Sequence, residues 1–320
     1  MNRTLNPIMD KADTPSVLLS VVSPVYNGSA YLTPFLQSVL NQSFSDFELI
    51  MVDDGSTDDS VQIIQTYQEK DARIHLIRQN HQGAGSARNI GLSHVKGQYI
   101  IFLDSDDWFN EDFFKIMLNR ITKDQSDVAV CEFFIYNQQT GEKQISAIAE
   151  TGNQKIEKTN LVFDLFTPNT WVKVYRTAFL KENHLLFQEI PSCNDWSFAF
   201  ASLACANRIS VIREPLVYYR TQTNTSISSY RYKRTKDIVR AIQHLKHELK
   251  SRGLYSQYQE GFARKSVNHL VYEAFAGRRW KGIYVLARNL LIVNDWAVYK
   301  AFVFKVIHYL GKRLRKALIN

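Results

Sequence analysis

The sequence predicts an α/β protein in which a mostly parallel sheet is flanked by helices, with a basic helical appendage at the C-terminal end. Three observations predict this fold. Short apolar runs alternate with amphipathic segments in the first hundred residues, three of these runs end in polar segments, and the charge changes near residue 230. The chain has 320 residues, 45% of them hydrophobic and 22% charged, which excludes wholesale disorder.

The apolar runs are expected to be strands, and the amphipathic segments between them helices. The expected strands are Val17–Val22, Phe47–Val52, Ile74–Ile77 and Tyr99–Leu103. The expected helices are Ala30–Leu40, Asp58–Lys70 and Ser86–Val95. Strands that are apolar throughout indicate a parallel sheet covered on both faces. Ligands of such sheets bind beyond the carboxyl ends of the strands, so those ends are the place to look for chemistry.

Polar residues follow three of the expected strands. The segments are 23–28 (SPVYNG), 53–58 (DDGSTD) and 104–107 (DSDD). Because the strands are parallel, these segments should meet at one edge of the sheet. That edge would be rich in carboxylates, which repel one another unless a cation or hydrogen-bond donors compensate their charge.

Asp104 and Asp106 directly follow an apolar strand and are one residue apart. Both carboxylates can reach one hard divalent cation, and two protein ligands leave positions that a diphosphate can fill. The alternative is a plain turn or helix cap, for which Asp and Ser are also common. Asp53 stands at a strand end without an obvious structural task, and its carboxylate could accept the N–H of a pyrimidine ring. Asp58 is expected to cap the helix that follows.

Small residues open the third helix, in the segment 83–91 (GAGSARNIG). They permit close approach, and Arg88 in the first turn could reach a phosphate or a base. A helix cap with one solvated arginine is the alternative.

Taken together, in this order and spacing, these motifs indicate a protein family more specifically than any single motif does. The chain resembles the family 2 glycosyltransferases, which have the GT-A fold, from about Val17 to Ser228. The resemblance is carried by SPVYNG, VDDGSTD, GAGSARNIG and FLDSDD, and by later landmarks at Trp171–Arg176, Asn194–Trp196 and Glu214–Arg220.

The resemblance implies an inverting enzyme that moves a sugar from a nucleotide-sugar donor, a UDP-hexose or UDP-N-acetylhexosamine, to a hydroxyl of a bacterial surface glycan, lipid-linked or protein-linked. Pro24 and Tyr26 would line the base pocket, and Asp53 would recognise the uracil. The residues implied at the donor are Pro24, Tyr26, Asp53, Arg88, Asp104, Ser105 and Asp106, with Asp104 and Asp106 also holding Mn²⁺ or Mg²⁺.

Asp195 stands where the family keeps the catalytic base. Two residues depart from the family pattern. Asn194 replaces a glutamate that many relatives have before this aspartate. His81 replaces an asparagine and is expected to be an exposed loop residue.

The basic residues are concentrated towards the C-terminus: residues 230–320 hold 20 of the 39 Lys and Arg but 5 of the 31 Asp and Glu. This shift predicts an N-terminal extension over 1–16, a catalytic domain over 17–229 and a basic helical region over 230–320. In the last expected helix one side is apolar (Tyr299, Phe302, Val303, Val306, Leu310 and Leu314) and the other basic. Such a helix suits an anionic membrane surface. The alternative is that its apolar side packs on the catalytic domain or on another subunit.

Other classes are less favoured. Three dispersed cysteines and the absence of a long apolar stretch favour a cytoplasmic protein, peripheral at most on the inner face of the membrane. A sugar-nucleotide pyrophosphorylase would need a basic glycine-rich loop after the first strand, and SPVYNG has no basic residue. A non-catalytic polyanion-binding protein would leave the carboxylates unexplained, so no nucleic-acid partner is expected.

Overall fold

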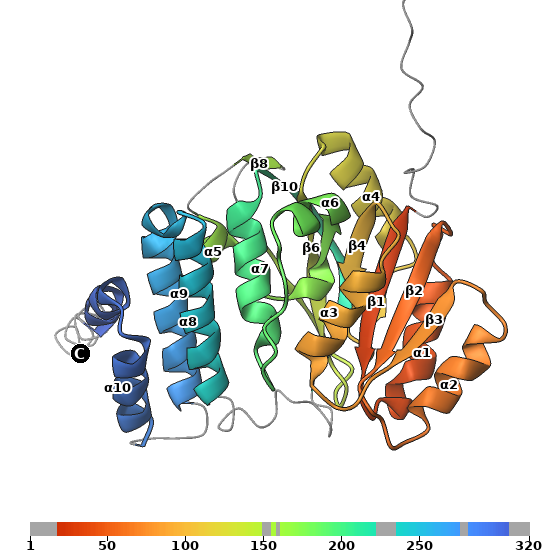
Figure 1. Ribbon diagram of the computed structural model, residues 1–320, viewed down its shortest axis with the longest axis horizontal. Coiled ribbons are helices and arrows are strands. Elements are labelled where there is room, and N and C mark those ends of the chain that lie inside the picture. The colour runs from red at the N-terminus through yellow and green to blue at the C-terminus, as the bar shows by residue number, and fades with distance from the viewer. Residues whose placement is uncertain (1–17, 149–154, 158–160, 222–234, 276–280, 307–320) are drawn as a thin grey trace, which may run out of the picture.

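The computed structural model describes residues 18–148, 155–157, 161–221, 235–275 and 281–306. One twisted sheet crosses the molecule, with helices on both of its faces, and the C-terminal helices lie beyond one of those flanking helices (Figure 1). The expected boundary at residue 229, the 1–16 extension and the end of the last expected helix fall outside the described residues.

The first half has the alternating strands and helices that the sequence predicts. The elements are β1 (Leu19–Val25), α1 (Ser29–Leu40), β2 (Phe47–Asp53), α2 (Ser60–Gln68), β3 (Ile74–Arg78), α3 (Ala84–His94) and β4 (Tyr99–Phe102). The four strands are parallel and lie in the order β3-β2-β1-β4.

The first strand differs from the expected Val17–Val22 and continues through Pro24 to Val25. The Val22 carbonyl oxygen accepts a hydrogen bond from the Leu103 N–H, on the β4 side. The Val25 carbonyl oxygen accepts one from the Asp54 N–H, on the β2 side. Alternation therefore turns Pro24 towards β4, which pairs with β1 only as far as Val22. The N–H that proline lacks is not needed there, and the strand can continue.

The second half adds antiparallel pairing, so the sheet is mixed. Its elements are β5 (Trp108–Phe109), α4 (Phe113–Asp124), β6 (Val128–Asn137), β7 (Lys143–Ser146), β8 (Lys155–Glu157), α5 (Val162–Leu165), the 3₁₀ turn Thr170–Val172, β9 (Lys173–Arg176), α6 (Thr177–Glu182), α7 (Asn194–Cys205) and β10 (Arg208–Thr221). β9 lies between β4 and β6 and is antiparallel to both. The sheet order continues β4-β9-β6-β10-β5.

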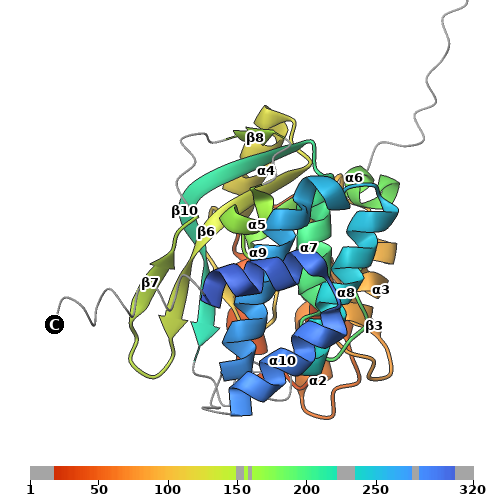
Figure 2. The same cartoon turned by 90° about the vertical axis from the view of Figure 1, so that its left-hand side faces the viewer.

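The C-terminal helices are α8 (Thr235–Ser251), α9 (Tyr255–Phe275), α10 (Lys281–Val293) and a further helix over 296–306. α8 packs against α7 and α9 (Figure 2). Its Ile238, Ile242 and Leu245 are fully buried. Within the described ranges, no helix is long and apolar enough to cross a bilayer.

The helix over 296–306 only partly follows the apolar side expected from its sequence. Tyr299 and Phe302 pack against the core, whereas Val303 and Val306 are exposed. Val298, which was not part of the expected stripe, is fully buried instead. The expectation failed here because helical spacing alone does not tell which of several neighbouring faces meets the preceding helices.

Candidate active site

The carboxyl ends of β1, β2 and β4 form one edge of the sheet, where the polar segments meet as expected. Asp53 is the last residue of β2, in register with Val25 of β1. Its side chain is fully buried, and its Oδ1 accepts the Ser56 N–H at 3.2 Å. In the described part of the chain its Oδ2 has no hydrogen-bond partner, although Arg78 Nε lies 3.5 Å away. A buried carboxylate oxygen without a donor is one that a ligand can satisfy.

Tyr26 lies beside this carboxylate edge and forms an exposed aromatic surface. Its ring is 49% exposed and stacks on His81, with centroids 4.1 Å apart. His81 is exposed, as expected, but it is held in place, because its Nδ1 lies 2.8 Å from Asp54 Oδ2. Pro24, in the last part of β1, precedes this platform and is half-buried.

Asp54 organises the loop that carries His81, a role that sequence reasoning missed. Its carboxylate accepts the backbone N–H groups of Gln82 and Gly83, both at 2.8 Å, and the side-chain amide of Gln79 at 2.5 Å. It therefore fixes the entry into α3. The repeated Asp in 53–54 was a signal that two carboxylates with different tasks lie at this strand end.

Asp58 ties the two helices of this region together. Its carboxylate accepts the N–H of Ser60, the first residue of α2, and that of Ser29, the first residue of α1, both at 3.0 Å. Asp58 is not the N-cap of α2 as expected, because α2 begins one residue later and Asp59 occupies that position. The Asp58 carboxylate instead holds the first residues of two helices.

Three carboxylates meet in the turn after β4. Ligand atoms of Asp104, Asp106 and Asp107 all lie within 4.8 Å of one another. Burial, followed by the charge of Asp104, raises the pKa of Asp106 to about 6, and burial raises that of Asp107 well above its usual value. Ser105 is half-buried in the same turn.

The donor set of this turn fits a hard divalent cation. The ligands are carboxylate oxygens, and Asp107 Oδ2 is buried without a hydrogen-bond partner among the described residues. A bound cation would offset both the burial of these carboxylates and their mutual repulsion, which together raise the pKa values of Asp106 and Asp107. The site expected from the sequence consists of Asp104 and Asp106, and the structure adds Asp107 to them.

Arg88 is enclosed rather than solvated, which excludes the alternative of a free arginine at a helix cap. Its guanidinium donates to Asp104 Oδ1 at 2.6 Å and to Asn194 Oδ1 at 2.7 Å. The guanidinium carbon of Arg88 also lies 5.3 Å from the centre of the Phe187 ring. Arg88 thus joins the carboxylate turn to the first residue of α7, and Asn194, the departure from the family pattern, is what it binds there.

Asp195 is the next residue of α7 and is half-buried in its first turn. The preceding loop lies very close to α3. A Cβ atom at Gly85 would lie 2.4 Å from the Gln188 carbonyl oxygen, so only glycine fits there. Asn89 of α3 also exchanges two hydrogen bonds with the Phe187 backbone. The small residues of the 83–91 segment therefore fix the helix that carries Asp195.

Lys173, at the start of β9, has a fully buried ammonium group that sequence reasoning did not single out. Its Nζ donates to the carbonyl oxygens of Thr167 at 2.8 Å and Asn169 at 2.5 Å. Burial lowers the pKa of Lys173 to about 7, and the negative charge of Asp195 acts in the opposite direction. It lies within the landmark Trp171–Arg176, the signal that could have found it.

Arg220, at the end of β10, braces the carboxylate turn from the other side. Its backbone N–H donates to Asp107 Oδ1 and its Nε to the Asp106 carbonyl, both at 2.9 Å. Its guanidinium lies 4.5 Å from the centre of the Trp108 ring. The turn is therefore held between Arg88 and Arg220.

The chain is similar to known proteins in both sequence and structure. The model of the family "Glycosyl transferase family 2" matches residues 20–183. EpsH of Bacillus subtilis strain 168, described as a putative glycosyltransferase, is 33% identical over 228 residues, which cover 69% of this chain and 65% of EpsH. The cholesterol galactosyltransferase of Borreliella burgdorferi is 25% identical over 308 residues, covering 92% of this chain and 82% of that protein.

A further relative is TarS of Staphylococcus aureus strain Mu50, a poly(ribitol-phosphate) β-N-acetylglucosaminyltransferase. It is 30% identical over 253 residues, which are 78% of this chain but 43% of TarS. The crystal structure of TarS 1–349 in complex with UDP-GlcNAc superposes with a TM-score of 0.73 at 26% identity, covering 88% of this chain and 83% of that one. The chain thus spans about two thirds of EpsH and less than half of TarS.

Proposed function

Because the chain belongs to glycosyl transferase family 2 and is a glycosyltransferase with the GT-A fold, we propose that it moves a sugar from a UDP-sugar to an acceptor hydroxyl. The acceptor is a bacterial surface glycan, lipid-linked or protein-linked, and the transfer inverts the anomeric centre of the sugar. One observation carries the proposal. Arg88 donates hydrogen bonds to Asp104 of the carboxylate turn and to Asn194, the neighbour of Asp195. Hydrogen bonds therefore connect the proposed diphosphate side of the site to the proposed acceptor side. Family membership also decides against the pyrophosphorylase and the polyanion-binding protein.

The donor's uridine binds at the ends of β1 and β2. Asp53 Oδ2, buried and without a hydrogen-bond donor in the described ranges, accepts the N–H of the uracil ring. The Tyr26 ring, stacked on His81, is the aromatic surface beside it, and Pro24 lines the same pocket. The complex of TarS with UDP-GlcNAc supports a UDP-sugar as the donor.

Asp104 and Asp106 would hold Mn²⁺ or Mg²⁺ and the diphosphate, and Ser105 of the same turn and Arg88 of α3 would contact the donor there. The cation, when bound, offsets the negative charge that develops on the leaving diphosphate. Arg88 keeps the Asp104 carboxylate in position, and Arg220 holds the Asp106 carbonyl and the Asp107 carboxylate.

Asp195 acts as the catalytic base. Its carboxylate takes the proton of the acceptor hydroxyl while the hydroxyl oxygen bonds to the anomeric carbon, and the bond from that carbon to the diphosphate oxygen breaks. UDP leaves with the electron pair of that bond. A single displacement of this kind inverts the anomeric centre.

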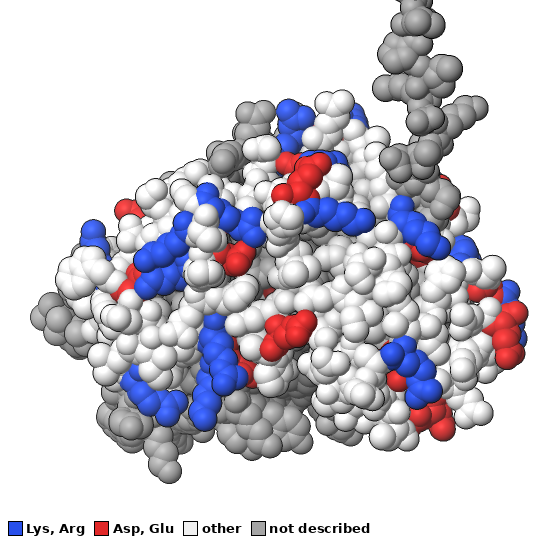
Figure 3. Space-filling view, in the orientation of Figure 1, with Lys and Arg blue, Asp and Glu red and all other residues white. Residues whose placement is uncertain are grey.

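The C-terminal helices dock the enzyme on an anionic membrane surface, where lipid-linked acceptors lie. Lys and Arg side chains gather over these helices, on the left of Figure 3. On the helix over 296–306, Trp296, Val303 and Phe304 recur at i, i+7 and i+8 and are 79%, 53% and 73% exposed. We call these three residues the exposed apolar stripe. Exposed apolar side chains next to basic ones suit the surface of an anionic bilayer.

Calorimetric titration with UDP tests the donor site. UDP is expected to bind in the presence of Mn²⁺ and to bind at least tenfold more weakly when the ion is chelated. Asp106→Ala should remove this dependence on the ion. The matched control is Asp46→Ala, because Asp46 is exposed and precedes the start of β2, at the opposite end of that strand from Asp53. Tight UDP binding that needs no ion and is unaffected by Asp106→Ala would refute the metal assignment.

A screen of UDP-, GDP- and dTDP-sugars for hydrolysis then identifies the donor.

A further inference from the structure

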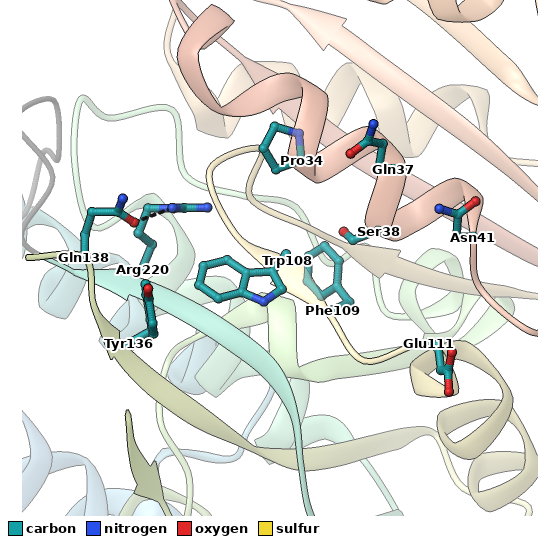
Figure 4. A pocket seen from close by; sticks show the side chains of 10 residues that line it. All are labelled: Pro34, Gln37, Ser38, Asn41, Trp108, Phe109, Glu111, Tyr136, Gln138 and Arg220. Carbon is teal, nitrogen blue, oxygen red and sulfur yellow. Dashed lines mark hydrogen bonds between the residues drawn. The ribbon is translucent and has the colours of Figure 1, made fainter. Parts of the chain in front are cut away.

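An open groove of about 550 Å³ lies between α1 and the ends of β6 and β10. Figure 4 shows it with the indole ring of Trp108 at its centre. The wall from α1 consists of residues three or four positions apart, hence of one helix face. The lining of the groove includes Gln37, Asn41, Trp108, Tyr136, Gln138 and Arg220. No lining residue contacts the donor in the proposal above. Arg220 alone among them touches the donor site, because it braces the carboxylate turn.

The lining of the groove combines aromatic rings with uncharged polar groups. Trp108 stacks on Tyr218 and meets Tyr136 edge to face, so these rings form a fixed wall. Gln37 and Asn41 are exposed on the α1 wall and offer amide groups that both donate and accept hydrogen bonds. Sugar rings present apolar C–H faces and hydroxyl rims, which are the two kinds of surface that such a lining satisfies.

The charges in the groove do not favour a polyanion. Arg220 is engaged: it donates to Gln138 Oε1 at 2.5 Å and to the Asp106 carbonyl, and its guanidinium covers Trp108. The other charged lining residue, Glu111, is negative and exposed. The groove therefore suits a neutral glycan.

Arg220 also places the groove next to the reaction. The same residue borders the groove and donates its backbone N–H to Asp107 in the carboxylate turn. A chain of sugars in the groove would thus lie one side chain away from the turn proposed to hold the donor diphosphate.

We propose that this groove is an acceptor subsite that binds neutral sugar residues of the acceptor glycan, apart from the residue that receives the transferred sugar. The proposal rests on the glycosyltransferase function proposed above. It assigns the exposed face of α1 to acceptor binding, and it makes Gln37 and Asn41 residues that recognise the glycan.

Direct binding measurements test this subsite without relying on turnover. Chitotetraose, cellotetraose and maltotetraose are titrated by calorimetry into the wild-type chain, into Gln37→Trp, which fills the groove, and into Gln65→Trp as the matched control. Gln65 is an exposed glutamine on α2 and is not among the residues that line the groove. At least one tetrasaccharide should bind the wild type saturably, at least tenfold more weakly to Gln37→Trp, and within twofold of wild type to Gln65→Trp.

The donor site is followed separately by UDP binding with Mn²⁺, which Gln37→Trp should leave within twofold of wild type. If Gln37→Trp loses UDP binding as well, Asn41→Trp replaces it, one helical turn further along the same wall. The subsite is refuted if none of the three sugars binds the wild type, or if both groove variants bind as well as the wild type. Loss of UDP binding by the wild type would instead count against the proposed function.

Discussion

At the scale of single residues, the aspartate at the start of α7 has one chemical task in the proposed reaction. Asp195→Asn keeps the size of the side chain but removes its ability to take a proton. We expect the turnover number for sugar transfer to fall by about 10² to 10⁴-fold, the usual contribution of a general base, while the UDP dissociation constant stays within twofold. Radiolabelled transfer and calorimetry measure the two quantities. Asp46→Asn is the matched control, and substantial turnover by Asp195→Asn would remove Asp195 as the base.

Lys173 links residue chemistry to stability. Its folded pKa of about 7 lies below the usual lysine value, because burial disfavours the charged form. Between pH 7 and about 10 the unfolded chain therefore holds a proton that the folded chain has lost, and stability rises with pH. In Lys173→Met this contribution is absent. We expect the free energy of unfolding, measured in urea, to rise less from pH 7 to pH 9 in this variant than in the wild type.

The control for this pH dependence is Lys96→Met, which removes an exposed lysine and should follow the wild-type pH profile. Parallel profiles for the wild type and Lys173→Met would contradict a depressed pKa at Lys173.

At the scale of elements, the turn before α7 is held by α8, which lies in the C-terminal region. Ser192 Oγ donates to Asp237 Oδ2 at 2.9 Å, and both side chains are buried. Removing one partner leaves a buried polar group unsatisfied, at about 1 to 3 kcal/mol. We expect Ser192→Ala to lose stability of this order and also to slow transfer severalfold, because the turn positions the helix that carries Asp195.

Ser126→Ala is the matched control for Ser192→Ala. Ser126 Oγ pairs with Ser210 Oγ at 2.7 Å, and both side chains are buried near the starts of β6 and β10, at the opposite edge of the sheet from the carboxylate turn. Its loss should lower the melting temperature less than Ser192→Ala does, because Ser210 keeps its hydrogen bond to Asp124, and it should leave the turnover number unchanged. Equal effects of both variants on turnover would show that the α7–α8 contact serves stability alone.

The sequence predicted the parallel half of the sheet, because apolar strands and polar strand ends are local patterns. The positions of Asp53 and Asp104 at one edge followed from that alone. The partners of the site could not be predicted in the same way. Arg220 bonds to Asp106 across 114 residues and Arg88 to Asn194 across 106, so no local pattern announces either contact. The antiparallel β9, which brings Lys173 into the core, likewise depends on long-range pairing.

At the scale of the whole molecule, the C-terminal helices are part of the body and cannot be removed to test them. Ile238 and Ile242 of α8 and Tyr258 of α9 are fully buried, so a chain ending near residue 230 would expose apolar core. Lys246 of α8 pairs with Asp295 at 3.0 Å, and Tyr255 of α9 donates to the same carboxylate. Membrane docking therefore has to be tested by surface substitutions in the intact chain.

Trp296→Ser combined with Phe304→Ser shortens the exposed apolar stripe without touching the core. We expect the wild type to sediment with vesicles containing anionic phosphatidylglycerol and the double variant to bind them at least fivefold more weakly, because the buried apolar area and the nearby basic charge act together. Ile145→Ser, which removes an exposed apolar side chain on β7, is the control and should bind as the wild type does. Unchanged vesicle binding together with a smaller oligomer in the double variant would assign the stripe to self-association instead.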